Sequence, residues 1–424
     1  MNEKKLSTEA YKGVRDFYPE DMAIQRYIFD SWSKTAESFG FERYEASILE
    51  PSDLYRSKGA ENEEMVNEQT YTFIDRGERE VTLRPEMTPT VARMVAGKFR
   101  ELKLPLRWYS IPNLFRYERP QRGRLREHWQ LNCDIFGSND RIADTEIIAL
   151  AYQTLINFGA TPEMFEIRIN DRDLMKQTYN SIGITNDETI RKITHLNDRK
   201  RKITADEYKS KLIEITSDET LANKIIYTLE QNDTDSDIIQ NLSDLGIKNV
   251  VFDKSLARGF DYYTGTVFEI FDKSTENNRS LIGGGRYDNL TKLFGGEEIS
   301  GVGFGMGDVT MRDFLETHNL LPNNVRKTSP DLIILPIESG LNISGQKLAM
   351  GLRERGIKVA VDISTKKLSK KITDAFDKNI TFALVVGPDE IADNTFTLKN
   401  LHTNMEEKGD FDKISSLLIT NLNK

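Results

Sequence analysis

Apolar side chains recur with the period of an amphipathic helix in two stretches of the N-terminal part of the chain. In residues 25–40 they stand three or four positions apart, and the pattern stops at Gly40. Residues 141–158 repeat this spacing and end at Gly159. Such spacing with a terminal glycine is typical of a helix that buries one face. We therefore expect helices over both stretches.

Around these helices the pattern is that of β-strands. Runs at 70–75, 81–86 and 165–169 have strand character, and the last of them alternates clearly. Two longer patterns, "LRWYSIPNLFRYE" and "WQLNCDIFG", predict strands joined by "RPQRGRL". Pro120 and Gly123 interrupt the pattern there, so we expect a turn between the two strands.

The second half of the chain changes period twice. Residues from about 175 to 245 are polar and mostly helical, which predicts a helical insert, and strand character then returns with "VVFDKSLARGFDYYTGTVFEIFD". The glycines of "LIGGGRYDNL" predict a turn, and "GVGFGMGDVTMRDFL" predicts a glycine-rich strand that leads into a helix. After a candidate linker at 320–330, apolar strands alternate with helices, which predicts a small parallel sheet covered by helices.

The composition is that of a soluble globular protein with more than one domain. The 424 residues are 38% hydrophobic and 29% charged, with a net charge of −9. No apolar run is long enough to span a bilayer, and the N-terminus lacks the apolar segment of a secretion signal, so a cytoplasmic location is expected. Cys133 is the only cysteine and the four histidines are far apart, which argues against a disulfide and against a metal site.

One short stretch departs from this acidic composition. Residues 115–127 contain five arginines and two glutamates. Arginine is rarely buried without a partner, and its planar guanidinium fits phosphate oxygens and carboxylates. The stretch therefore predicts a site for a polyphosphate, a nucleic-acid backbone or both. An exposed basic hairpin with solvated charges fits the same spacing.

Two further stretches carry residues suited to ligand binding. In "LRPEMT" Glu86 follows a strand and could hold an ammonium group, or it could form a salt bridge with Arg84 or another basic neighbour. In "LARGFDYYTGTVFE" Tyr262 and Tyr263 would face opposite sides of a strand, so that at most one lines any given pocket. A core strand with aromatic packing is the alternative for this second stretch.

The glycine-rich stretches have neither the spacing of a P-loop nor that of a dinucleotide fingerprint. In "GVGFGMG" at 301–307, however, every second residue is a glycine. Such a strand lacks side chains on one face, so a flat ring such as a nucleotide base could lie against it. Tight packing against a neighbouring strand would use the same glycines.

Taken in this order, the stretches resemble the histidyl-tRNA synthetase family of class II aminoacyl-tRNA synthetases, over about residues 10–420. "FRYERPQRGR…HWQ" resembles class II motif 2, and "LARGFDYYTGTVFE" resembles the signature peptide of the histidine enzymes. "GGGRYDNL" is a further family mark, and the last hundred or so residues, including "TFTLKNL", resemble the anticodon-binding domain.

The resemblance implies an α+β fold: a class II antiparallel sheet with flanking helices, a helical insert and a C-terminal α/β anticodon-binding domain. The implied boundaries are 1–174 for the first catalytic part with motifs 1 and 2, 175–245 for the helical insertion, 246–322 for the second catalytic part with the histidine signature and motif 3, and 330–424 for the anticodon-binding domain. A homodimer is also implied.

The implied activity is that of an aminoacyl-tRNA ligase. Such an enzyme activates L-histidine with ATP to give histidyl-adenylate and diphosphate, and then transfers the histidyl group to the 3′ end of tRNA(His). ATP is a substrate, and Mg²⁺ is expected only as an ion bound through the ATP phosphates.

The resemblance also implies which residues form the active site. Arg116 and Arg258 would be catalytic, one on each side of the ATP α-phosphate. Glu118 would read the adenine edge, Arg124 would hold the outer phosphates and His128 would stack on the base. The implied histidine-binding residues are Glu86, Thr88, Arg116, Gln130, Asp134, Arg258, Tyr262 and Tyr263. Glu86 would take the α-ammonium group, and Asp134 and Tyr263 would bracket the imidazole. Gln121 and Arg122 would contact the tRNA.

Three positions depart from the family pattern. Ser47 stands where motif 1, which belongs to the dimer interface, usually has a proline. Motif 3 usually ends in an acidic residue followed by an arginine that packs over adenine, but here Val309 follows Asp308 and the next arginine is Arg312. His128 occupies a position that is more often phenylalanine.

Two other functions share parts of this pattern. A catalytically inactive paralogue that regulates histidine biosynthesis would have the catalytic fold, but such paralogues typically lack the signature arginine and the C-terminal domain, which this chain has. A tRNA-binding or signalling module would be favoured by a damaged amino-acid pocket. The incomplete motif 3 is the feature that most favours either alternative.

Overall fold

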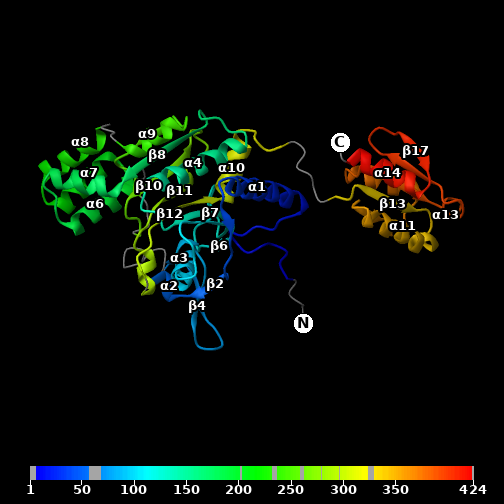
Figure 1. The fold of residues 1–424 in the computed structure, drawn as a ribbon, viewed down its shortest axis with the longest axis horizontal. Coiled ribbons are helices and arrows are strands. Elements are labelled where there is room, and N and C mark those ends of the chain that lie inside the picture. Colours follow the sequence, from blue (N-terminus) through cyan, green and yellow to red (C-terminus); the bar gives the residue numbers. More distant parts are fainter. Residues whose placement is uncertain are drawn as a thin grey trace. The chain divides into compact units, whose positions relative to one another are not determined.

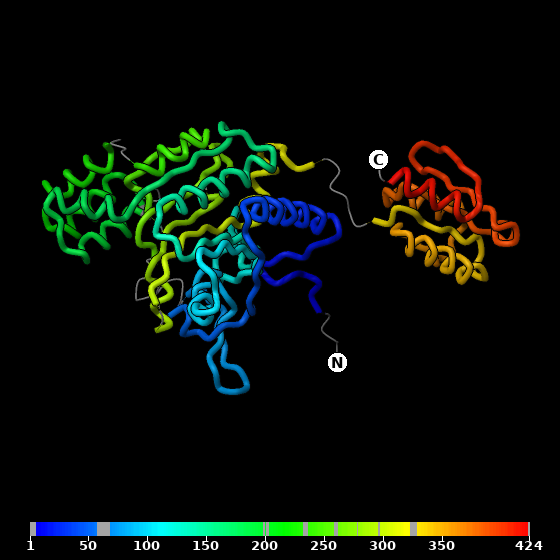
Figure 2. Tube along the Cα trace, viewed as in Figure 1, coloured from blue at the N-terminus to red at the C-terminus, as the bar shows by residue number. Residues whose placement is uncertain are grey.

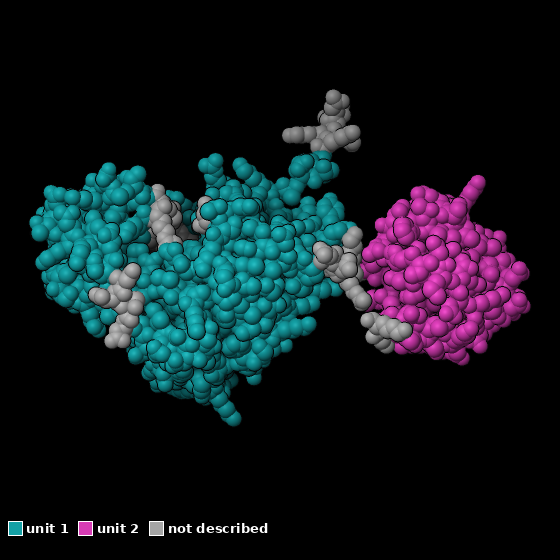
Figure 3. Space-filling view, turned by 90° about the horizontal axis from the view of Figure 1, so that it is seen from above, with its two compact units in different colours: residues 1–323 teal, residues 324–424 magenta. Residues whose placement is uncertain are grey.

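The computed structural model describes residues 6–56, 68–200, 203–231, 236–257, 262–277, 279–295, 297–322 and 329–422. The chain divides into two compact units, residues 1–323 and 324–424, which are coloured separately in Figure 3. The linker predicted at 320–330 contains the junction between them, and its residues 323–328 lie outside the described residues.

The described part of the first unit is built on a sheet of nine strands (Figure 1). Their bounds are β1 Glu42–Arg43, β5 Leu106–Ser110, β6 Asn113–Phe115, β7 Glu127–Phe136, β8 Phe165–Asp171, β9 Val250–Phe252, β10 Thr266–Asp272, β11 Ser280–Arg286 and β12 Gly301–Gly307. The order is β1-β5-β7-β12-β11-β10-β8-β9, with β6 paired to β7. All neighbours are antiparallel except β1 with β5 and β8 with β9. The predicted α+β class with a mainly antiparallel sheet and flanking helices is confirmed.

One face of this sheet is covered by helices. They are α1 (Pro19–Ser38), α4 (Ile142–Asn157), α9 (Asp237–Asp244) and α10 (Asp308–Thr317). Trp32 of α1, Ile148 of α4 and Phe314 of α10 are buried in one core with residues of the sheet. The two helices expected from sequence are confirmed as α1 and α4. The first begins earlier than predicted, at Pro19, because proline followed by two acidic residues is a favourable first turn.

The opposite face of the sheet carries smaller elements. These are the helices α2 (Asp53–Arg56) and α3 (Thr88–Lys98), the 3-10 helix η4 (Leu290–Phe294), and a three-stranded sheet in the order β2 (Leu49–Pro51), β4 (Glu80–Leu83), β3 (Tyr71–Ile74). Side chains of α3 and η4 share a second buried cluster with Tyr263 and Tyr287. The cavities of the candidate site lie on this face of the sheet.

Four helices after β8 form a core of their own. They are α5 (Arg172–Ser181), α6 (Asp187–Arg199), α7 (Ala205–Thr216) and α8 (Glu219–Glu230), and α6 to α8 are the green helices at one end of the unit in Figure 2. Tyr179, Leu212 and Ile225 are buried in this helical core. Helix α9, in the same polar stretch, packs instead on the main core through Ile238 and Leu242.

The second unit contains a five-stranded sheet among its described residues. The order is β14 (Val359–Val361), β13 (Leu332–Pro336), β15 (Phe382–Val386), β16 (Phe396–Asn400), β17 (Glu406–Gly409). Helices α11 (Asn342–Glu354) and α14 (Phe411–Leu422) pack on one face, and α12 (Leu368–Asp377) packs on the other. A short helix, α13 (Pro388–Ala392), precedes β16. The small parallel sheet predicted from sequence is confirmed for β14, β13 and β15, and β16 and β17 extend it as antiparallel strands that the pattern did not predict.

Two local expectations were wrong. The glycines 283–285 lie within strand β11 and not in a turn. Residues 253–257 and 262–265 are loop and not strand, so the strand alternation expected for Tyr262 and Tyr263 does not apply. Among the described residues no helix is both long enough and apolar enough to cross a membrane.

Candidate active site

Strand β7 divides its side chains between the core and the candidate site. Leu131, Cys133 and Ile135 are buried in the helix-covered core. Gln130, Asn132 and Asp134 alternate with them and therefore point to the opposite face. Gln130 and Asn132 line a small cavity on that face, and Asp134 is buried beside them. One face of β7 therefore contributes apolar side chains to the hydrophobic core, and its other face contributes polar side chains to the candidate site.

Glycines on the neighbouring strands make room for this polar row. In β12, Gly307, Gly305 and Gly303 pair with Gln130, Asn132 and Asp134, and the next strand places Gly283 beside Gly305 and Gly285 beside Gly303. A β-carbon at position 305 would be 2.5 Å from Nε2 of Gln130. At position 285 it would be 2.8 Å from the ring of Tyr263. The alternate glycines therefore leave the space that the site side chains occupy.

Two cavities meet on this face of the sheet. The larger has a volume of about 860 Å³ and is lined by Glu118, Arg124 and His128 among others. The smaller, about 30 Å³, is lined by Glu86, Thr88, Asn132, Tyr262, Tyr263 and Tyr287 among others. Arg116, Gln130, Gly283 and Gly305 line both cavities. Arg116 and Gln130 therefore stand at their junction.

The arginines of the 115–127 stretch divide into different roles. Arg116 and Arg124 line the larger cavity. Arg126 does not, because its guanidinium stacks over Tyr117 with its carbon 3.9 Å from the ring centroid. Arg122 donates from Nε to Oδ1 of Asn277 at 3.0 Å. Arg119 is exposed. Only part of this positive charge is thus available to a ligand in the cavity.

Arg116 is held in place by a contact beside the small cavity. Its Nε donates a hydrogen bond of 2.8 Å to the carbonyl oxygen of Pro85, the residue that precedes Glu86. Its backbone nitrogen donates to Arg126 O at 2.9 Å, which closes the hairpin. The hydrogen bond to Pro85 thus couples the position of the Arg116 guanidinium to that of the Glu86 carboxylate.

Glu118 and Arg124 form an ion pair across the hairpin, with Nε of Arg124 2.7 Å from the Glu118 carboxylate. Glu118 is buried, whereas the Arg124 side chain is 40% exposed. A buried carboxylate paired with a more exposed guanidinium can exchange that partner for a donor on a ligand. This pair therefore places a carboxylate acceptor and a partly exposed guanidinium side by side at the wall of the larger cavity.

His128 is a neutral ring in this environment. Burial and the cations Arg116, Arg15 and Arg124 lower the pKa of its imidazole to about 3. It lies on β7 two residues before Gln130, on the same side of the strand, and it lines the larger cavity. An uncharged imidazole can stack on a base without adding to the positive charge around it.

The small cavity brings together residues that are far apart in sequence. The hydroxyl of Tyr262 donates to the Glu86 carboxylate at 3.3 Å. The rings of Tyr262 and Tyr263 lie 4.7 Å apart, and both line the cavity. The expectation that at most one of these tyrosines faces a given pocket is therefore corrected, because they lie in a loop where side-chain alternation does not hold. Glu86 does not pair with Arg84, whose guanidinium is bound to Glu45 and to backbone carbonyls.

Asp134 lies behind this cavity and is connected to it through Tyr287. The Tyr287 hydroxyl donates a hydrogen bond to Oδ1 of Asp134. The other oxygen, Oδ2, is buried without a hydrogen-bond partner among the described residues. Burial raises the pKa of this carboxyl to about 7, and the Tyr287 hydrogen bond opposes the rise only in part. Tyr287 rather than Asp134 lines the cavity wall.

Sequence reasoning missed Asn132 and Tyr287 as site residues. The position of Asn132 could have been found from the alternation on β7, since it stands between Gln130 and Asp134. Tyr287 belongs to "GGGRYDNL", but its contact with Asp134 joins residues 153 positions apart and has no local signal. The arginine of the same stretch is structural: Arg286 is buried in an ion pair with Asp144, with Nε 3.0 Å from Oδ2.

A model of the histidyl-tRNA synthetase family matches residues 13–308, and a model of the anticodon-binding domain matches residues 331–421. The histidine–tRNA ligase of Leptospira biflexa is 44% identical over 419 residues, which cover 95% of each chain. That of Thermoplasma volcanium is 37% identical over 421 residues, which cover 95% of this chain and 96% of the relative.

The chain belongs to the histidyl-tRNA synthetase family. Solved structures agree with this assignment at the level of the fold. The histidyl-tRNA synthetase from Nostoc sp. PCC 7120 superposes with a TM-score of 0.78 at 22% identity, covering 98% of this chain and all of the other. The apo enzyme from S. aureus gives 0.74 at 24% identity, covering 97% of this chain and all of the other.

Three residues expected from the histidyl-tRNA synthetase pattern, Arg258, Gln121 and Arg122, are not among the described residues that line the two cavities. Arg258, the predicted partner of Arg116, lies outside the described residues. Gln121 is exposed at the tip of the motif 2 hairpin, and its bridge to Arg124 closes the turn. The tRNA contacts expected for Gln121 and Arg122 stay predictions.

The incomplete motif 3 has a structural explanation at each of its positions. Asp308 accepts a hydrogen bond from the backbone nitrogen of Trp129 at 2.9 Å and pairs with Arg15 at 2.7 Å. Val309 lines the larger cavity, where the family usually has an arginine. Arg312 pairs with Asp21 at 3.2 Å and with Glu316 at 2.8 Å, and it does not line the cavity. Arg312 therefore does not replace the missing arginine.

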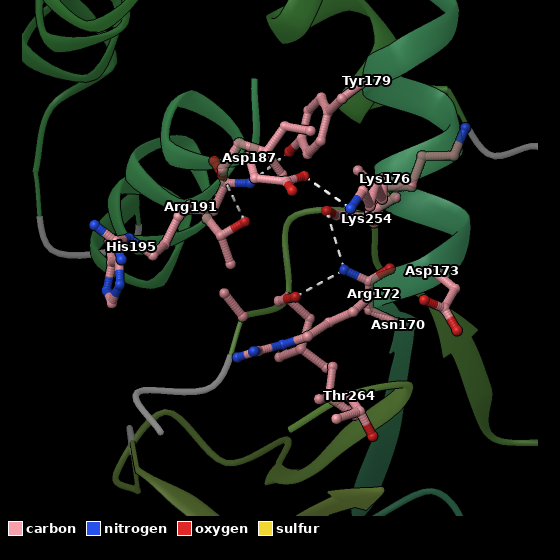
Figure 4. Close-up of a pocket in the computed structure, with 17 residues that line it drawn as sticks. Asn170, Arg172, Asp173, Lys176, Tyr179, Asp187, Arg191, His195, Lys254 and Thr264 are labelled. Carbon is pink, nitrogen blue, oxygen red and sulfur yellow. Dashed lines mark hydrogen bonds and ion pairs between the residues drawn. The ribbon is translucent and has the colours of Figure 1, made fainter. Parts of the chain in front are cut away.

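A third cavity, of about 230 Å³, lies between the helical core and the main sheet (Figure 4). Helices α5 and α6 supply Lys176, Asp187 and Arg191, and Asn170 comes from β8. Lys176 is paired with Asp187 at 2.7 Å. No group of three or more His, Cys, Asp or Glu side chains suited to a metal ion occurs in the part of the chain that the structure describes.

Proposed function

We propose that this chain is a histidine–tRNA ligase that forms histidyl-adenylate at the junction of the two cavities. The observation that carries the proposal is that Arg116 and Gln130 line both cavities. A group placed there can touch the carboxylate of an amino acid in the small cavity and the α-phosphate of a nucleotide in the large one. That is the arrangement required to join the two substrates.

The first step needs stabilisation of negative charge at phosphorus. A carboxylate oxygen of histidine attacks the α-phosphorus of ATP, the bond to the bridging oxygen breaks, and diphosphate leaves. Arg116, fixed by Pro85, presents a positive charge to the phosphate oxygens as this charge develops. Arg258 of the signature peptide would act from the other side. Arg124 would release Glu118 and hold the outer phosphates, and Mg²⁺ would enter bound to those phosphates.

Recognition of histidine rests on polar groups around the small cavity. Glu86 supplies a carboxylate for the α-ammonium group, with Thr88 beside it at the start of α3. Asp134 and Tyr287 form a buried hydrogen-bonded unit next to Tyr263, suited to the imidazole nitrogens. A ring without these nitrogens would leave buried polar groups unpaired, which can discriminate by about 10⁴-fold or more.

The second step transfers the histidyl group to tRNA(His). The 3′-terminal hydroxyl attacks the carbonyl carbon of the adenylate, and AMP leaves. The motif 2 hairpin with Gln121 and Arg122 would contact the acceptor end, and the domain at 330–424 would bind the anticodon. We further propose a homodimer located in the cytoplasm, with the helical insertion at 175–245 contacting the acceptor arm.

Histidine-dependent exchange of labelled diphosphate into ATP tests this function. The wild-type protein should exchange label only with histidine present, and Arg116→Ala should lower the rate by about 10²- to 10³-fold, as for loss of one charge-stabilising donor. Arg312→Ala is a matched control, because Arg312 lies outside both cavities. A wild-type protein that binds histidine but exchanges no label would instead be the regulatory paralogue.

A further inference from the structure

The larger cavity contains two arginines, Arg168 and Arg279, whose roles the sequence does not indicate. Arg116, Arg124, Arg168 and Arg279 are the cations that line it among the described residues. Arg124 pairs with Glu118, and Arg168 pairs with Glu166 and Asp253. Arg279 comes from the loop between β10 and β11, and no ion pair or hydrogen bond of its guanidinium with the described residues occurs.

The stem of Arg279 is fixed between two elements of the ATP side of the site. A β-carbon on Gly123, at the tip of the motif 2 hairpin, would be 3.2 Å from Cγ of Arg279 and 3.3 Å from the methyl group of Thr310. The Arg279 stem therefore lies against the hairpin next to Arg124, beside the start of α10. This is the end of the cavity where Glu118 and Val309 also lie.

The loop that carries Arg279 is anchored by a hydrogen-bond network. Asn277 accepts from Arg122 at 3.0 Å and donates to Asp272 at 2.7 Å. The other oxygen of Asp272 is bonded to His318 at 2.8 Å. Both oxygens of Asp272 are therefore hydrogen-bonded within this network. The loop is thus held to the hairpin while Arg279 faces the cavity.

We propose that Arg279 is a nucleotide-binding residue whose planar guanidinium packs against the purine ring of ATP. It would take the place left open by Val309 in motif 3, from a different segment of the chain. The surroundings favour a ring over a phosphate group, because Leu281, Val309 and Thr310 line the same end of the cavity and Gly307 leaves space there. A guanidinium over an aromatic face gives a cation–π attraction. This inference rests on the proposed ATP-dependent function.

The alternative role for Arg279 is contact with the triphosphate. Substitutions at this position distinguish a contact with the purine ring from a contact with the phosphates. Arg279→Met keeps an unbranched stem against Gly123 and Thr310 but removes the guanidinium. Arg279→Lys keeps the charge but removes the planar surface. Arg312→Ala removes a guanidinium of the neighbouring helix outside the cavity. Thermal unfolding of all three variants identifies any loss of the fold.

The decisive measurements are the KM for ATP in histidine-dependent exchange and the inhibition constant of adenosine, which has a purine ring but no phosphate. We expect Arg279→Met to raise both by about 5- to 30-fold, in the range of a cation–π contact, and Arg279→Lys to raise both by a smaller factor, because an ammonium group keeps part of that attraction but not the planar surface. The KM for histidine should stay within about twofold of wild type. Arg312→Ala should change neither ATP nor adenosine binding.

Three outcomes would overturn the proposal. They are an unchanged adenosine inhibition constant in Arg279→Met, full recovery by Arg279→Lys, or an equal effect of Arg312→Ala. The first two results together would assign Arg279 to the phosphates. If the wild-type protein exchanged no label at all, the proposed function would fail, and equilibrium dialysis with adenosine would still test whether Arg279 contacts the base.

Discussion

The hydroxyl of Tyr287 donates a hydrogen bond to Asp134, and the second oxygen of that buried carboxylate has no partner among the described residues. Burial raises the pKa of Asp134 from 3.8 to about 7. The folded protein therefore holds a proton between about pH 4 and pH 7 that the unfolded chain has released. The contribution of this group to stability is fully present below pH 4 and is lost as the pH rises through 7.

Asp134→Asn removes this titration. We expect the free energy of unfolding of the variant, relative to wild type, to increase as the pH is raised from 4 to 7, which urea titration at several pH values measures. Tyr287→Phe should raise the pKa of Asp134 further, because its hydrogen bond favours the ionised form. A parallel pH dependence in wild type and Asp134→Asn would contradict a buried titrating carboxyl at this position.

The pH dependence of stability that His128 causes should have the opposite sign to that of Asp134. Its pKa is lowered to about 3, so between pH 3 and about 6.5 the unfolded chain binds a proton that the folded protein does not. Its contribution is present above pH 6.5 and is lost on acidification. We expect His128→Phe to be less sensitive to acid than wild type, as monitored by thermal unfolding at pH 4, 5 and 7. Equal acid sensitivity of the two proteins would show that the imidazole is protonated in the folded state.

Gly305 sets the position of Gln130. A β-carbon at 305 would lie 2.5 Å from Nε2 of Gln130, so the Gln130 side chain must move in Gly305→Ala. We expect the KM for histidine to rise about tenfold or more and the exchange rate to fall, since a displacement of about 1 Å can cost on the order of 10²-fold.

Gly97→Ala is a matched control for this substitution. Gly97 lies near the end of α3, and a β-carbon there meets no atom within 4 Å. We expect normal kinetics and a gain in stability of about 0.5–1 kcal/mol from the better helix propensity of alanine. Unchanged histidine kinetics in Gly305→Ala would mean that Gln130 is not a substrate ligand.

The buried pair of Arg286 and Asp144 should matter for stability rather than for substrate contact. Arg286 also donates to Ser138 O at 2.9 Å, which ties β11 to the loop before α4. Arg286→Ala would leave the Asp144 carboxylate buried without its partner, and we expect a loss of about 3–5 kcal/mol in the free energy of unfolding. Chemical denaturation measures this loss. A change below about 1 kcal/mol would show that solvent or another side chain compensates the charge.

Several features could be predicted from the sequence because they depend on neighbouring residues. The helical period of residues 141–158 and the strand alternation of "WQLNCDIFG" describe which face of each element is apolar, and both elements were confirmed. The order of the family motifs also identified Arg116, Glu86 and Gln130 as candidates, and the structure places all three around the joined cavities.

Other features needed the tertiary structure. The glycines of "GGGRYDNL" have the composition of a turn, yet they lie in β11, where Phe268 and Phe304 occupy the space beside Gly284 and the ring of Tyr263 occupies the space beside Gly285. Tyr262 and Tyr263 line one cavity because their segment is a loop. Arg279 carries no motif, and only the packing of its loop against Gly123 brings it to the cavity.

The sequence by itself determined the family, many of the helices and strands and several polar groups of the candidate site, since periodicity and motif order are properties of the linear chain. The tertiary structure decided which of those groups share a cavity, that Tyr287 lies between Asp134 and the small cavity, and that Arg279 lines the larger cavity. The reason is that these contacts join segments more than a hundred residues apart, and their geometry depends on the pairing of strands and on the side-chain volume that the intervening glycines leave free.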